Sequence, residues 1–158
     1  MAYENIDVDL DPSLASNPEA AWFRGLLSRV LDALGQSPKV GLTLLVTTDE
    51  RVHDLNLRYR QVDAPTDVLS FPAGEDAAFV TPEGLPPYLG DIVISWPTVR
   101  RQAAEHAHDV EDELALLVVH GVLHLLGYDH QGAKDQRVMW AKQADILAGL
   151  GIEVPSDL

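Results

Sequence analysis

The chain has 158 residues, of which 46% are hydrophobic and 23% are charged, and these values predict one globular domain over residues 1–158. It contains no cysteine, which excludes disulfides, a cysteine nucleophile and a metal site with thiolate ligands. Eleven Lys and Arg against 25 Asp and Glu give a net charge of −14, which argues against loose binding to a nucleic-acid backbone.

The hydrophobic pattern predicts strands and helices along the whole chain. Period-two alternation and short β-branched apolar runs predict strands, whereas apolar residues spaced three and four apart predict helices. We expect Asn17 to be the N-cap of the first helix and Pro18 its first residue, and Ser95 to cap a later helix. In chain order, the expected elements are a strand at 5–10, a helix at 20–34, a strand at 40–47, a helix at 49–60, strands at 67–71 and 91–95, a helix at 97–107, a helix that Asp109 or Asp112 caps and that runs to about residue 126, and a helix at 133–150.

These elements predict a single α+β domain with a mixed sheet of about four strands packed by helices. Residues 72–88 are rich in proline and glycine and are expected to form a surface loop that passes beside the site. No stretch approaches the roughly 20 apolar residues of a membrane span, and the N-terminus does not resemble a signal peptide. We therefore expect a cytoplasmic protein without a membrane partner.

The predicted helix between Leu114 and Leu126 is apolar on every side except at His120 and His124. Residues four apart lie on one helical face, and a buried imidazole without a partner is costly, so a shared metal ion satisfies both rings. Gly127 then turns the chain and His130 follows as a third ligand, which completes the pattern HxxxHxxGxxH at the end of a buried helix. Three neutral imidazoles leave a coordination position open, which is typical of catalytic zinc.

Two other interpretations of this spacing remain. Zinc peptidases share it, but in them a Glu follows the first His as general base, and here that position is Gly121. Its absence disfavours peptide hydrolysis and suits an anionic substrate such as a phosphodiester. Alternatively, a carboxylate such as Asp129 fills the open position and the zinc only holds the fold, or Asp129 orients a histidine. His106 and His108 are expected to lie near the negative end of a helix, with a second metal site as the alternative.

Three blocks of sequence resemble the bacterial rRNA maturation factor family of single-domain metal-dependent endoribonucleases. They are residues 56–72 (NLRYRQVDAPTDVLSFP), 89–95 (LGDIVIS) and 120–130 (HGVLHLLGYDH). The resemblance implies that His120, His124 and His130 bind one zinc ion per chain. It also implies that Arg60, which matches the Arg of the family's Tyr-Arg pair, lines the cleft.

The resemblance further implies a single-strand-specific endoribonuclease that forms the 3′ end of small-subunit rRNA and acts in ribosome quality control. Ribosomal RNA, the small ribosomal subunit, a ribosomal protein and an assembly GTPase are the expected partners, and docking on such a protein would offset the acidic surface. We expect Arg60 to grip a phosphate oxygen, Ser70 to donate a hydrogen bond to the same group, and Asp67 either to orient Arg60 or to cap a turn. A zinc metallopeptidase-like hydrolase and a non-catalytic ribosome assembly factor with structural zinc remain the alternatives.

Overall fold

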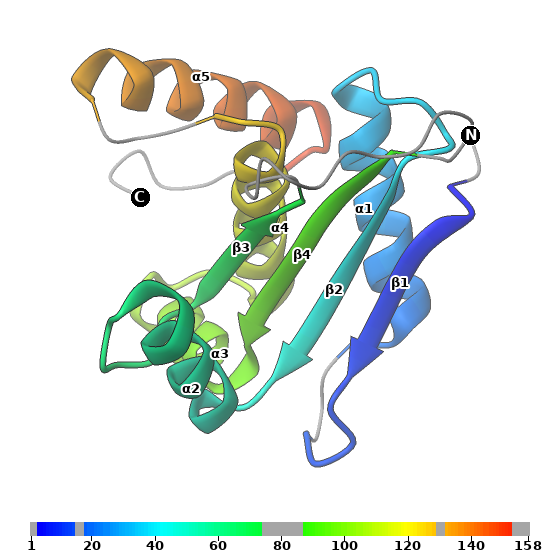
Figure 1. Ribbon diagram of the computed structural model, residues 1–158. Helices are drawn as coiled ribbons and strands as arrows, with labels where there is room; N and C mark the ends of the chain where they lie inside the picture. Colours follow the sequence, from blue (N-terminus) through cyan, green and yellow to red (C-terminus); the bar gives the residue numbers. More distant parts are fainter. Residues whose placement is uncertain (1–2, 15–17, 74–86, 129–131, 153–158) are drawn as a thin grey trace.

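The computed structural model describes residues 3–14, 18–73, 87–128 and 132–152. In these ranges the chain forms four strands and five helices, and the order of the elements confirms the α+β prediction (Figure 1). Their bounds are β1 (Asn5–Leu10), α1 (Ala20–Ala33), β2 (Gly41–Thr47), α2 (Asp49–Arg60), β3 (Val68–Pro72), β4 (Tyr88–Ser95), α3 (Trp96–Glu105), α4 (Val110–Leu125) and α5 (Ala133–Gly149).

The strands form one mixed sheet in the order β1-β2-β4-β3. β1 pairs in parallel with β2, β2 pairs in parallel with β4, and β3 runs antiparallel to β4, so that β1 and β3 are the edge strands. Within the β3–β4 pair, Ser70 lies opposite Ile92. The antiparallel edge strand is what makes the sheet mixed, as predicted.

Side chains alternate between the two faces of this sheet and build two unequal hydrophobic clusters. Leu44, Ile92 and Ile94 point to the face that α1 and α4 cover, where the main core lies (Figure 1). Leu69 and Val93 point to the opposite face and pack with Val52 of α2. Strand β3 therefore separates α4 from α2, and its successive residues contact elements on opposite sides of the sheet.

The central helix of the main core is α4, which confirms the expected buried helix. Its mean composition is strongly apolar, and the buried residues occupy nearly its whole circumference. The sheet, α1, α3 and α5 all contact it. No helix of the described ranges is long and apolar enough to cross a membrane.

Two predicted boundaries were wrong. The N-cap of α1 is Glu19, whose backbone is extended, and Pro18 precedes the helix instead of opening it; Asn17 lies outside the described residues. Strand β4 starts at Tyr88, three residues earlier than predicted, because Gly41 in β2 already pairs with Tyr88. The glycine at position 90 breaks the apolar pattern without ending the strand.

The polar contacts of Asp49 fix the start of α2 against α3. Thr48 is the N-cap of α2, and its side chain accepts a hydrogen bond from the backbone of Arg51. The carboxylate of Asp49 accepts hydrogen bonds from Ser95, from Thr98 at 2.7 Å and from Arg101 at 3.1 Å. Burial raises the pKa of this carboxyl, but the three hydrogen bonds outweigh burial and hold the pKa below its usual value. The anchored helix then carries Arg60 at its opposite end.

Candidate functional site

His120 and His124 lie side by side on one face of α4. Their Nε2 atoms are 3.1 Å apart, their ring centroids are 4.6 Å apart, and both side chains are half-buried. Two nitrogens bound to one tetrahedral ion at about 2.0–2.1 Å would be roughly 3.3 Å apart. The predicted pair therefore points both nitrogens at one position, at a spacing that fits a shared metal ion. The third predicted ligand, His130, lies outside the described residues, as does Asp129.

Helix α5 supplies two further side chains to His120 that the sequence analysis missed. Nδ1 of His120 lies 3.1 Å from Oε1 of the buried Gln143, and the ring of Trp140 meets the imidazole edge-on at a centroid distance of 5.8 Å. Because an amide oxygen can only accept, Nδ1 of His120 donates this hydrogen bond to Gln143, and the lone pair of its neutral ring then lies on Nε2. Gln143 thus orients the His120 ring so that Nε2 points toward His124.

Gly121 places α4 close against the sheet directly after the first histidine. A Cβ atom at this position would lie 3.1 Å from Cγ2 of Ile92 in β4, which is tighter than ordinary van der Waals contact. The backbone carbonyl of Gly121 also accepts a hydrogen bond from Oγ of Ser70 in β3, at 3.3 Å. The glutamate that zinc peptidases carry here would therefore require the Ile92 side chain to move by a few tenths of an ångström, so close packing favours glycine at this position.

Arg60 reaches the same strand from the opposite side of the sheet. One of its terminal nitrogens donates to the backbone oxygen of Ser70 at 2.5 Å, and its guanidinium carbon lies 5.1 Å from the centre of the Phe71 ring. Ser70 is therefore in contact with both Arg60 and Gly121. The structure brings the predicted residues Arg60 and Ser70 together and connects them to the turn of α4 that carries His120.

Asp67 contacts its own strand and α3. Its Oδ1 accepts hydrogen bonds from the backbone of Val68 at 2.7 Å and from Thr66 at 3.3 Å. With its amide nitrogen facing the carboxylates, Gln102 donates to Oδ2 of Asp67 at 3.1 Å and to Oε1 of Glu113 at 2.9 Å. Among the described residues, these contacts hold Asp67 against the start of β3 and against α3, and none of them is with Arg60.

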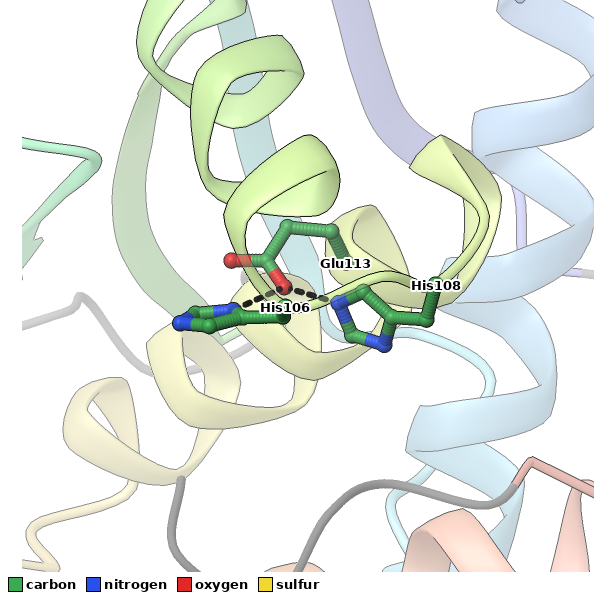
Figure 2. Close-up of side chains that lie close together, drawn as sticks. All are labelled: His106, His108 and Glu113. Carbon is green, nitrogen blue, oxygen red and sulfur yellow. Dashed lines mark hydrogen bonds and ion pairs between the residues drawn. The ribbon is translucent and has the colours of Figure 1, made fainter.

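A second group of ionisable side chains lies at the corner between α3 and α4 (Figure 2). Oε2 of Glu113 lies 2.5 Å from Nε2 of His108 and 3.4 Å from Nδ1 of His106, and the Glu113 side chain is 1% exposed. The ligand atoms of these three residues lie within 4.8 Å of one another, so the group could bind a metal ion. His106 is the C-cap of α3 and so lies near a helix end, as predicted, whereas the contribution of Glu113 was not predicted.

The comparisons with known proteins identify the family. The family model described as endoribonuclease YbeY matches residues 6–151. The chain belongs to the endoribonuclease YbeY family. It is 48% identical over 148 residues to an endoribonuclease YbeY of Roseiflexus castenholzii, with 93% of each chain covered. A second relative of that name, from Shouchella clausii, is 41% identical over 154 residues, which cover 93% of this chain and 96% of the relative.

A solved structure with the same fold supports the assignment. The solution structure of TM1509 from Thermotoga maritima matches with a TM-score of 0.57 and 25% sequence identity, over 92% of this chain and 91% of that one. The resemblance predicted from the three sequence blocks is thus confirmed. YbeY proteins are named as endoribonucleases, which are hydrolases that act on RNA.

Proposed function

We propose that this protein is a zinc-dependent endoribonuclease whose single zinc ion is bound by His120, His124 and His130. Membership of the YbeY family supports the activity. The observation that carries the metal assignment is the approach of two imidazole nitrogens to 3.1 Å in a stretch of α4, residues 114–125, that is otherwise buried and apolar. When bound, the zinc supplies a Lewis acid that polarises the phosphate and stabilises its developing charge.

The second group, around Glu113, fits a zinc site less well. The separation of 2.5 Å between His108 and Glu113 is that of a short hydrogen bond, and it is shorter than the spacing of roughly 3.3 Å between two ligands of a tetrahedral ion. His106 and the amide of Gln102 add further donors to the same carboxylate. These contacts satisfy a buried carboxylate without an ion, so we assign the catalytic metal to the histidines of α4 and the turn after it.

The chain's own residues would bind and orient the RNA. The guanidinium of Arg60 has five N–H donors, one of which holds the Ser70 carbonyl, so others remain to grip a non-bridging phosphate oxygen. Because position 121 is a glycine and not a glutamate, no carboxylate at that position would repel the phosphate. The hydrogen bond from Ser70 to the carbonyl of Gly121 holds β3 against α4. We further propose that Ser70 donates a hydrogen bond to the substrate when the strand of RNA replaces its present partner, and that Asp67 keeps the start of β3 in place.

We propose small-subunit rRNA as the substrate, cleaved in a single-stranded region during 3′-end maturation and ribosome quality control in the cytoplasm. The net charge of −14 makes tight binding to bare RNA unfavourable. A ribosomal protein of the small subunit and an assembly GTPase would place the enzyme on its substrate.

The net charge also favours a second candidate function, that of a non-catalytic assembly factor with structural zinc. In that case chelation of the zinc would unfold the protein, while Arg60→Ala would leave its function intact.

The deciding experiment maps the 3′ ends of small-subunit rRNA in cells whose only copy of this protein carries His124→Ala. We expect extended precursor ends while the variant remains folded and abundant, and mature ends in cells with the unchanged protein. Mature ends in both strains would contradict the assignment to rRNA maturation and would favour a small-substrate hydrolase.

A change at Gln143 tests the contact that fixes the His120 tautomer. Gln143→Leu removes the acceptor for Nδ1–H of His120, and partners of metal ligands typically change metal affinity by roughly 10–100-fold. We expect zinc affinity to fall by about that factor in competition with a chromogenic chelator. Gln143→Glu keeps an acceptor and should retain most of the affinity. Equal zinc affinity in wild type and Gln143→Leu would show that the contact does not support the metal site.

A further inference from the structure

An aromatic pair lies on the side of β3 that faces away from α4. Tyr59, at the end of α2, is 60% exposed, and its ring meets that of Phe71 at a centroid distance of 5.6 Å and an angle of 72°. Phe71 is itself partly buried against the small cluster that contains Val52 and Leu69. One ring is thus fixed in the fold and holds the other, which is open to solvent.

This pair lies directly beside the proposed phosphate-binding residue. Arg60 follows Tyr59 in sequence, its guanidinium lies 5.1 Å from the centre of the Phe71 ring, and it donates to the carbonyl of Ser70. Because Ser70 also contacts Gly121, a short series of contacts joins the aromatic pair to the helical turn of His120. An RNA strand whose phosphate meets Arg60 would have a neighbouring base within reach of Tyr59.

The exposure of Tyr59 is not isolated. Leu57 and Val62, on either side of it in sequence, are both 46% exposed, so three of the five exposed large hydrophobic side chains of the described residues lie between positions 57 and 62. Nearby cations are Arg58, which pairs with Asp54 at 3.1 Å, and Arg60. A surface that combines a held aromatic ring with a guanidinium is typical of sites that bind single-stranded nucleic acid.

We propose that Tyr59, held by Phe71 and next to Arg60, stacks on an unpaired base of the RNA substrate. The ligand is a single nucleobase of any type, because every base offers a flat face and the pair presents few groups that would read its edges. A base in a duplex is stacked between its neighbours, so this contact selects single-stranded RNA over duplex RNA. The proposal rests on the proposed function and adds a substrate contact to it.

Binding of a fluorescent single-stranded 2′-O-methyl RNA with phosphorothioate linkages tests the proposal, because such a strand resists cleavage by the zinc-loaded protein. We expect Tyr59→Leu to weaken binding roughly 10-fold in fluorescence anisotropy, since stacking on an aromatic side chain typically contributes that much or more per base. Tyr59→Phe keeps the ring and should bind like wild type. Val138→Ala, a matched change at an exposed apolar side chain of α5, should have little effect.

Binding of a set of RNA strands that each lack one base distinguishes stacking on that base from nonspecific binding to the surface. At one position, loss of the base should weaken binding to wild type but not to Tyr59→Leu, because that variant has already lost the stacking partner. Equal affinity of wild type and Tyr59→Leu, or equal sensitivity of both to every missing base, would overturn the proposal. If that happens while His124→Ala still loses RNA cleavage, the proposed function stands and only the stacking site is wrong.

Discussion

His124→Ala is expected to abolish zinc binding and RNA cleavage together. The substitution removes one of two imidazole nitrogens that lie 3.1 Å apart, and the loss should exceed the roughly 10–100-fold that follows from changing a residue that only supports a ligand. Elemental analysis of the purified variant and cleavage of an end-labelled single-stranded RNA measure the two effects.

Arg60→Ala should keep its zinc but lose roughly 10²–10³-fold in kcat, as expected when one donor to a developing charge is removed.

A variant of the other histidine group provides the control for this experiment. His106 is 3.4 Å from Glu113 and 29% exposed, so His106→Ala should leave both zinc content and cleavage close to wild type. Zinc loss in His106→Ala but not in His124→Ala would move the metal to the corner between α3 and α4. Cleavage that survives both His124→Ala and Arg60→Ala would contradict the proposed active site altogether.

The end groups of the RNA products would also identify the nucleophile, because attack by the 2′-hydroxyl leaves a cyclic phosphate.

Gly90→Ala is expected to have the largest effect on stability. Gly90 has a φ of 137°, and an added Cβ would lie 2.3 Å from the carbonyl oxygen of Phe71 and 2.9 Å from Cδ2 of Leu125. Backbone strain of about 1–3 kcal/mol and overpacking of about 1–3 kcal/mol both apply, which is a large part of a typical stability of about 5–15 kcal/mol. Urea denaturation followed by circular dichroism should show a strongly lowered midpoint, or a variant that does not fold.

Gly25 in α1 is the matched control for that measurement. A Cβ at this position meets nothing within 4 Å, and the residue lies within a helix. Gly25→Ala should therefore stabilise the protein by about 0.5–1 kcal/mol, because alanine has the higher helix propensity. If Gly90→Ala unfolds at the same urea concentration as wild type, the close packing of β3 on β4 and α4 described here is wrong.

The sequence predicted the elements well where a repeating pattern determined them. The β-branched run of β2 and the all-round apolar surface of α4 each allow few alternatives, and the structure confirms both. The hydrophobic pattern correctly predicted a helix from Ala20, but it does not determine which residue caps the helix, so the predicted N-cap of α1 was wrong. Strand β4 extends past Gly90 because pairing with β2 continues there, and pairing partners are not visible in local sequence.

The candidate site was predictable to the extent that its residues are close in sequence. His120 and His124 are one helical turn apart, so their approach follows from helix geometry. Gln143 comes from another helix, and no local rule connects it to His120. Its spacing from Met139 and Leu147, both buried, did place it on the buried side of α5, and a buried glutamine needs a partner.

The hydrogen bond from Arg60 to Ser70 also occupies a backbone group on the open edge of the sheet. Backbone groups of Asp67 and Ala73 bond toward β4, so those of Ser70, an odd number of residues away, point to the open side of the edge strand. An unpaired carbonyl there is an attachment point for a strand from another molecule, and the arginine occupies it with a charged side chain. The residue proposed to hold the substrate thus also covers an outward carbonyl of the edge strand with a positive charge, which disfavours pairing with a strand of another molecule.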